Sequence, residues 1–212
     1  MGGRTLTLLA SAAVAIGACT SSPKPPAPAP TSAVAPASPT SSGSGGAGCT
    51  EVQNVGPYDP ADENQLHVEQ LPPLSTYPSQ PPASGPHTAT PQPAGVSETP
   101  PELGAVIHSL EHGTAVIWYA PSVTAEPGFA AIADLVATDG DHTIMAPYDY
   151  PDAGSEGTLP EGTSLALVAW EHVQYCETLD LDAVTAFLSS YRAPPLGGGD
   201  YIGNAPEAGV PI

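Results

Sequence analysis

Two histidines and a glutamate near the middle of the chain have a spacing that suits metal chemistry. Residues 108–112 read His-Ser-Leu-Glu-His, and His87 ends a Pro-Pro-Ala-Ser-Gly-Pro-His run earlier in the chain. The H-x-x-E-H spacing places two zinc ligands on one helix face in one class of metalloproteases, with the glutamate as general base. Three of the six histidines therefore gather here, in a chain that has only three Lys plus Arg.

The surroundings of this motif favour extended backbone over a helix. Gly113 follows the motif directly, and residues 114–119 are β-branched or aromatic except for Ala115, as in a strand. Gly104 lies upstream, so at most two helical turns fit between the glycines. In an extended segment, residues 108 and 112 still share a face, because side chains alternate. We expect Glu111 to orient an imidazole or to pair with a backbone amide, without binding the ion itself.

Several motifs resemble those of a known family. They are 81–87, 108–113 followed by 116–119, and the late Pro206-Glu207 pair. Over about 67–207 the chain resembles a bacterial family catalogued as domain of unknown function 3105. The resemblance implies an exported, often membrane-anchored domain whose biochemistry is not established, and His67 resembles the early histidine of that family. Gly95-Val96 departs from the Gly-Tyr pair expected after the first histidine motif.

A metal site is the first hypothesis for these histidines. The ligand set that we predict for one copper or zinc ion is His67, His87, His108 and His112. Met145 is a weaker candidate, since its thioether would suit Cu(I), although a lone methionine in a strand usually serves packing. His142 and His172 fall at or in predicted strands, and we expect them to be structural.

Two other function classes stay open beside metal binding. In the first, the chain is a non-catalytic structural or interaction module of the cell envelope, whose imidazoles bond the backbone of an irregular segment. In the second, it is a hydrolase that uses the same metal. The chain has no nucleophile elbow, phosphate loop or dinucleotide fingerprint. The sequence therefore favours a protein that is not an enzyme.

The charge balance limits the partners. Twenty-two acidic residues stand against three Lys plus Arg, and the formal net charge is −19 at pH 7. Binding to nucleic acid or to anionic lipid headgroups needs clusters of Lys and Arg, so both are excluded as electrostatic partners. An acidic chain favours cations, although it is also simply soluble.

The N-terminus predicts export and a lipid anchor. Residues 1–18 carry one positive charge and an apolar stretch, as a signal peptide does. Ile16-Gly17-Ala18-Cys19 resembles a lipobox, in which Cys19 would carry fatty acyl chains such as palmitate. The composition of residues 19–48 predicts a disordered Pro/Ala/Ser linker. The protein would then be held by lipid alone at the outer face of the cytoplasmic membrane or the cell surface; the alternative is a soluble secreted protein.

The remaining residues, 49–212, are predicted to form one globular domain. Its two cysteines, Cys49 and Cys176, most simply pair as a disulfide in an exported chain. The less favoured alternative is that one of the two cysteines binds a metal ion as a thiolate.

The pattern of the later residues predicts an α+β fold in the order β-α-β-β-α. Strands are expected at 115–119, 142–146 and 165–173, and helices at 127–139 and 181–191. We expect a small mixed sheet with helices on one face, preceded by a long Pro-rich segment, 50–104, that wraps across it. This order is compatible with a thioredoxin-like arrangement, but no C-x-x-C is present.

Overall fold

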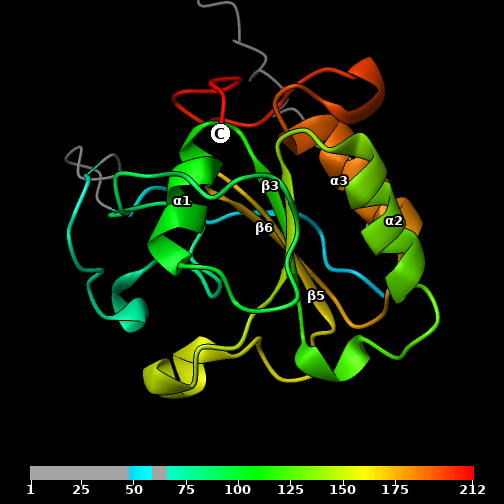
Figure 1. Ribbon diagram of the computed structural model, residues 1–212, viewed down its shortest axis with the longest axis horizontal. Helices are drawn as coiled ribbons and strands as arrows, with labels where there is room; N and C mark the ends of the chain where they lie inside the picture. Colours follow the sequence, from blue (N-terminus) through cyan, green and yellow to red (C-terminus); the bar gives the residue numbers. More distant parts are fainter. Residues whose placement is uncertain (1–47, 59–65) are drawn as a thin grey trace, which may run out of the picture. The chain divides into compact units, whose positions relative to one another are not determined.

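Three buried strands form the middle of a six-stranded mixed sheet (Figure 1). The structure is a computed structural model that describes residues 48–58 and 66–212. The strands are β3 (Ala115–Tyr119), β4 (Thr143–Pro147) and β5 (Leu165–Ala169), and every residue in them is buried. Continuous apolar runs of this kind need cover on both faces of a sheet.

Three further strands complete the sheet in the order β1-β6-β5-β3-β4-β2. They are β1 (Gln53–Asn54), β2 (Gly95–Val96) and β6 (His172–Cys176). β3 and β2 run parallel to β4, whereas β5 and β6 form an antiparallel pair beside β3. The Pro-rich region contributes only the two short strands at the edges, where proline is tolerated. The predicted α+β fold with a mixed sheet is confirmed.

The single long strand predicted over residues 165–173 is wrong. β5 and β6 are two strands of a hairpin, which turns at Trp170 and Glu171. Glu171 has φ of 60°, a left-handed conformation for which tight turns usually use Gly or Asn. Because neither residue type is present, the turn gave no signal in the sequence.

Helices α2 (Phe129–Asp139) and α3 (Leu181–Tyr191) cover one face of the sheet (Figure 1). Their ends agree with the predicted signals. Asp180 caps α3 by accepting from the N–H groups of Asp182 and Ala183, and Gly140 ends α2 with φ of 64°. Apolar side chains from both helices and from one side of β3 make up this half of the core: Ile117, Tyr119, Ile132, Val136, Val184 and Phe187.

A third helix, α1 (Leu103–Glu111), covers the opposite face, so the expectation of helices on one face only is wrong. Its apolar side chains pack against Val116 and Trp118, which alternate along β3 with the residues of the other face. They recur at helical spacing, as Leu103, Val106, Ile107 and Leu110. Glu102 caps the helix by accepting from the N–H groups of Gly104 and Ala105. This cap and this spacing were present in the sequence and outweigh the glycines beside them.

The Pro-rich segment packs against α1 and β6. Buried Tyr77 donates its hydroxyl to the carbonyl oxygen of Pro86 at 2.6 Å. Tyr175 donates to the carbonyl oxygen of Gln80, 2.7 Å away, which ties the segment to β6. These bonds hold the wrap, whose described residues form two short strands and one short 3-10 helix. The 3-10 helices of the described residues are η2 (Leu74–Thr76), η3 (Pro121–Val123), η4 (Pro151–Gly157) and η5 (Leu196–Gly198).

The predicted disulfide between Cys49 and Cys176 is present. It fastens the start of the described chain to the end of β6. Within residues 48–58 and 66–212, no helix is long and apolar enough to cross a membrane. The predicted signal peptide, Cys19 and the linker up to residue 47 lie outside the described residues. The thioredoxin-like arrangement stays a prediction, compatible with the order β3-α2-β4-β5-β6-α3.

Candidate metal centre

A short backbone pairing brings His67 and His87 side by side. The N–H of Val68 donates to the carbonyl oxygen of His87 at 2.8 Å, and the N–H of His87 donates to that of Leu66 at 3.0 Å. The two imidazole rings lie 5.0 Å apart between centroids. His87 is fully buried, whereas His67 is exposed. The Pro-rich wrap therefore delivers one buried and one accessible histidine to the same place.

The C-terminal end of α1 supplies the other two histidines. His108 lies in the last turn and His112 is the C-cap, so they are one helical turn apart on one face. Their Nε2 atoms are 3.1 Å apart, and both side chains are more than nine-tenths buried. The extended segment that the sequence analysis favoured is wrong, although the shared face that it required is present.

The donor atoms form two adjoining groups that could hold metal ions. His67, His87, His108 and Glu111 each offer one atom, and these four atoms all lie within 4.8 Å of one another. Glu111 also belongs to a second group, with His112 and Glu207. Because a zinc ion binds imidazole nitrogen at about 2.0 to 2.1 Å, donors around one ion stand about 3 to 4 Å apart. Small side-chain movements would bring either group to that range.

The ligand set expected from the sequence differs from these groups at three places. His67, His87 and His108 come together, but His112 falls in the second group. Glu111, which was expected only to orient an imidazole, brings its own carboxylate among the donors. Glu207 was not predicted as a ligand. The only signal for it was its place in the late Pro-Glu motif of the resembling family.

Each of three histidine rings is fixed by a contact between its Nδ1 atom and a backbone carbonyl oxygen. Nδ1 lies 2.8 Å from the Gly85 oxygen in His87, 2.7 Å from the Thr88 oxygen in His108, and 3.0 Å from the Pro211 oxygen in His112. A carbonyl oxygen only accepts, so we assign the ring proton to Nδ1 in each case. In the neutral ring Nε2 then carries no proton and has a free lone pair. A metal ion binds an imidazole through such a nitrogen.

These lone pairs face groups that cannot donate to them. Nε2 of His87 lies 3.1 Å from Oε2 of Glu111, yet it makes no well-directed hydrogen bond and counts as a buried atom without a partner. The short contact is not a hydrogen bond in the assigned tautomer, because both atoms are acceptors. Nε2 of His108 and Nε2 of His112 lie at hydrogen-bonding distance, 3.1 Å, but one of them would have to carry a proton to donate to the other. Either protons or a metal ion must offset this repulsion.

The electrostatics of Glu111 point to a cation. Burial raises the pKa of this carboxyl, but the contact with His87 and the charges of His87, His108 and His67 lower the pKa by more, so it lies below its ordinary value. The carboxylate is thus ionised while only 3% exposed. Burial also lowers the pKa of His108, against the bond to Thr88, and the neighbouring histidines lower it further. The lowering of the Glu111 pKa comes from positive charge on the rings, so the buried carboxylate stays ionised only with a cation beside it, either protons on the imidazoles or a metal ion.

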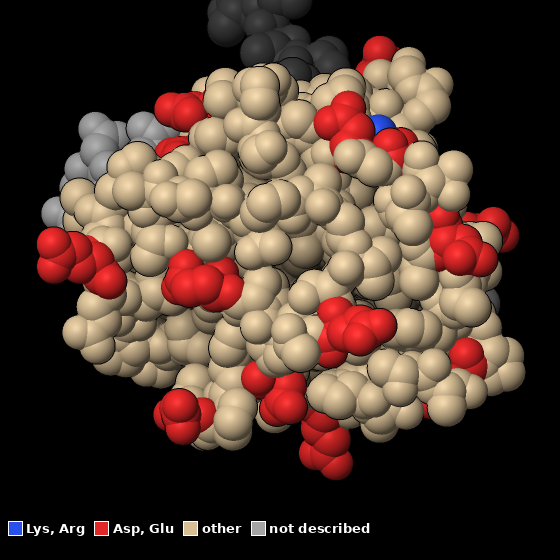
Figure 2. Space-filling view, in the orientation of Figure 1, with Lys and Arg blue, Asp and Glu red and all other residues tan. Residues whose placement is uncertain are grey.

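No basic side chain of the described residues neutralises Glu111. Arg192 is the one Lys or Arg within 48–58 and 66–212, and it pairs with Asp139. Acidic side chains scatter over the face seen in Figure 2, where blue is nearly absent. Buried Arg192 also donates to the carbonyl oxygen of Asp141 at 2.7 Å. A cation for the histidine cluster must therefore come from bound protons or from solution.

The remaining candidates lie elsewhere. Met145 is buried in the core beneath α2 and α3, on the other side of the sheet from α1. Nδ1 of His172 bonds the Trp170 carbonyl, and its ring packs on Tyr191. Nε2 of His142 bonds the Val210 carbonyl at 2.8 Å. None of these three residues belongs to either donor group.

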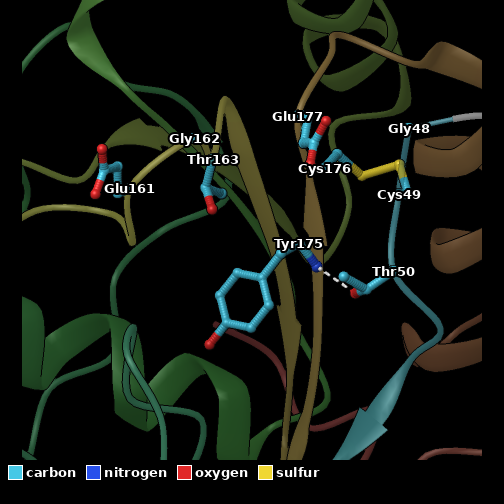
Figure 3. Close-up of a pocket in the computed structure, with 9 residues that line it drawn as sticks. All are labelled: Gly48, Cys49, Thr50, Glu161, Gly162, Thr163, Tyr175, Cys176 and Glu177. Atoms are coloured by element: carbon cyan, nitrogen blue, oxygen red, sulfur yellow. Dashed lines mark hydrogen bonds between the residues drawn. A yellow bond between two sulfur atoms is a disulfide. The ribbon is translucent and has the colours of Figure 1, made fainter.

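A separate pocket lies beside the disulfide (Figure 3). Cys49 and Cys176 form one wall, and Thr50 accepts a hydrogen bond from the N–H of Tyr175, 3.1 Å away. Its acidic residues are Glu161 and Glu177, and no histidine lines it. The pocket is therefore not part of the candidate metal centre.

The fold and the site define an α+β domain with a histidine and glutamate cluster that could hold a metal. The family model described as protein of unknown function (DUF3105) matches residues 67–200, and the chain belongs to this family. The match covers every residue of the first donor group. No curated protein and no solved structure matches the chain.

Proposed function

We propose that this protein is an exported, lipid-anchored metal-binding protein. A copper or zinc ion would be held by His67, His87, His108 and Glu111. Imidazole suits both metals, and a carboxylate suits Zn²⁺ or Cu²⁺ better than Cu⁺. Met145, the one residue that hinted at Cu⁺, lies on the other face of the sheet. The proposal therefore favours a divalent ion.

One observation carries the proposal: the buried Nε2 atom of His87 faces a carboxylate oxygen with its lone pair. An unpartnered buried polar atom costs about 1–3 kcal/mol. A metal ion between the two atoms would bind both and remove that cost. The carbonyls on the Nδ1 atoms support the same conclusion, since metal-binding histidines commonly donate their other ring N–H in this way.

The structural alternative would place protons on the same imidazoles. His87, as an imidazolium, would donate from Nε2 to Glu111, and the cluster would then only fasten the wrap to α1. In that case the protein would be a structural or interaction module of the cell envelope.

The hydrolase alternative requires the H-x-x-E-H motif to lie on a helix. The structure meets this requirement, because residues 108–111 lie in α1 and His112 is its C-cap. However, the Glu111 carboxylate is buried against His87 and is not free to activate a water as a general base. We therefore do not assign catalysis to this site.

The anchor and the location belong to the same proposal. Acylation of Cys19 would hold the protein at the outer face of the cytoplasmic membrane or at the cell surface. Residues 20–47 contain mostly Pro, Ala, Ser, Thr and Gly, a composition suited to a long flexible tether. The metal site would then face the extracytoplasmic medium.

Metal content of the purified full chain tests the function. The protein is stripped with a chelator, exposed separately to Zn²⁺ and Cu²⁺, dialysed, and analysed for bound metal. We expect stoichiometric retention of at least one of them. His67→Gln should weaken binding about 10-fold or more, by loss of a ligand, and this exposed residue can be changed without disturbing the core.

His172→Gln is the control, because this histidine bonds a carbonyl through Nδ1, as His87 and His108 do, but lies outside both donor groups. It should bind as the wild type does. A wild-type protein that stays metal-free under both conditions would contradict the proposal and favour the structural alternative. If His67→Gln and His172→Gln bind the metal equally well, His67 is not a ligand and the assigned ligand set is wrong.

A further inference from the structure

The second donor group adjoins the first and shares one residue with it. Glu111, His112 and Glu207 offer ligand atoms within 4.8 Å of one another. His112 is not needed by the first group, which already has three imidazoles and a carboxylate. Its Nε2 lies 3.3 Å from Oε2 of Glu207. The surplus histidine therefore has a carboxylate of its own.

The C-terminal tail, residues 205–212, builds this second group. The N–H of Glu207 donates to the carbonyl oxygen of Glu111 at 3.1 Å, and the N–H of Gly209 donates to that of His112 at 2.9 Å. The Pro211 carbonyl accepts from Nδ1 of His112. The tail thus uses the free carbonyls at the C-terminal end of α1, and it fixes both the ring and the carboxylate.

Gly113 lets the tail come this close. It has φ of 89°, and a Cβ there would stand 2.7 Å from the Cβ of Ala193 and 3.2 Å from the Cα of Ala208. A side chain at this position would push the tail away from α1. The close approach of Glu207 to His112 is therefore built into the backbone of the helix end.

A single ion in the first group would leave Nε2 of His112 without a cation of its own. Nε2 of His108 and Nε2 of His112 face each other at 3.1 Å, and both are lone pairs in the assigned tautomer. A cation on each side would draw each lone pair to its own ion. Glu111 has two carboxylate oxygens, and a carboxylate can bridge two ions that lie about 3.5–4 Å apart.

We propose that the site is dinuclear: a second divalent cation is held by His112, Glu207 and a bridging Glu111. This inference rests on the proposed function, because it shares Glu111 with the first ion. Glu207 is about half exposed, whereas Glu111 and His112 are buried. The second ion thus has three protein ligands and an opening toward solvent, so water completes its coordination. Three protein ligands plus water is the pattern of an open metal site.

Metal stoichiometry of the full chain is the first test, with Zn²⁺ as the probe in calorimetric titration and metal analysis. We expect about two ions per chain for the wild type. Glu207→Gln should reduce the number to about one, with the remaining ion bound as tightly as the stronger wild-type site. The exposed carboxylate makes this change safe for folding. Glu177→Gln, an exposed glutamate outside both groups, is the control and should still bind two.

The spectrum of bound Cu²⁺ is the second test. Two Cu²⁺ ions bridged by a carboxylate couple magnetically, so the loaded wild type should give a weaker or altered paramagnetic resonance signal than its copper content predicts. Glu207→Gln should restore the signal of an isolated ion. One ion in the wild type and an unchanged ion in Glu207→Gln would overturn the dinuclear site and leave the proposed function standing. No bound ion at all would overturn both.

Discussion

Nε2 of His108 lies 3.1 Å from Nε2 of His112, while Nδ1 of each ring contacts a backbone carbonyl. The carbonyls come from Thr88 in the Pro-rich wrap and from Pro211 near the C-terminus. Two distant segments therefore turn both rings of one helix toward a single point. In the assigned tautomer two buried lone pairs face each other, so we expect a bound cation to stabilise the domain.

Glu111→Gln should have opposite effects on the metal-free and the metal-bound protein. In the metal-free protein with His87 in the assigned neutral tautomer, Oε2 of Glu111 and Nε2 of His87 face each other as two acceptors 3.1 Å apart. The amide can donate to Nε2 of His87, which removes the clash of two acceptors. We expect the metal-free variant to gain about 1–3 kcal/mol in free energy of unfolding.

The same variant should lose most of the stabilisation that Zn²⁺ gives the wild type. Urea unfolding with and without metal measures both effects, and the exposed Glu177→Gln serves as the control. A metal-free Glu111→Gln protein that is less stable than the wild type would indicate that His87 is protonated and paired with the carboxylate.

Trp170 should report copper binding. Its ring centroid lies 6.4 Å from that of His87, in an edge-on contact. Bound Cu²⁺ quenches a nearby indole, so titration with Cu²⁺ should reduce the tryptophan emission. Trp170→Phe should lose the larger part of this quenching. Trp118 contacts the rings of Tyr148 and Tyr150 instead of a histidine. Trp118→Phe should therefore keep most of the quenching by Cu²⁺. Equal quenching in both variants would contradict the proposed position of the ion.

The disulfide should contribute to stability but not to metal binding. Cys49 and Cys176 are 127 residues apart in sequence, and closing so long a loop stabilises the fold by up to about 5 kcal/mol in the chain-entropy model. The double variant Cys49→Ser, Cys176→Ser should unfold at a lower urea concentration. Its metal content should equal that of the wild type, since no cysteine belongs to either donor group. A loss of bound metal in a folded variant would revive a cysteine ligand.

Arg192→Met should destabilise the domain by about 3–5 kcal/mol, because it leaves the Asp139 carboxylate largely buried without its partner. Arg192 also bonds Asp141 and Thr143, so it fastens the end of α3 to the start of β4. Adding Asp139→Asn should recover part of the loss, since no unpaired charge then remains. Denaturant unfolding of both single variants and the double variant measures the coupling. Additive effects would show that the ion pair contributes nothing of its own.

Cys19→Ser should move the protein from the membrane fraction to the medium. Two or more acyl chains give stable anchoring, which a polar linker cannot supply. Cell fractionation with immunodetection checks the location, and mass spectrometry of the wild-type N-terminus should find the acyl groups. Unchanged partitioning of the variant would contradict the lipid anchor.

The sequence by itself determined the elements whose signals are local. The β-branched and apolar run at residues 115–119 gave β3, and Asp180 and Gly140 marked helix ends through their own backbone bonds. The expectation of export to an oxidising compartment, together with only two cysteines in the predicted domain, was enough to predict the disulfide. The histidines were also identified by residue type, because few other side chains of this acidic chain can bind a soft cation.

Only the tertiary structure decided how those residues divide into a site. α1 was missed because glycines beside it outweighed its apolar spacing in a local reading, whereas packing on β3 stabilises it. The hairpin turn at Glu171 gave no sequence signal. Glu207 reaches His112 through backbone bonds between segments about a hundred residues apart, and the His67–His87 pairing depends on similar long-range contacts. Such contacts form only when the chain has folded, so residue spacing cannot reveal them.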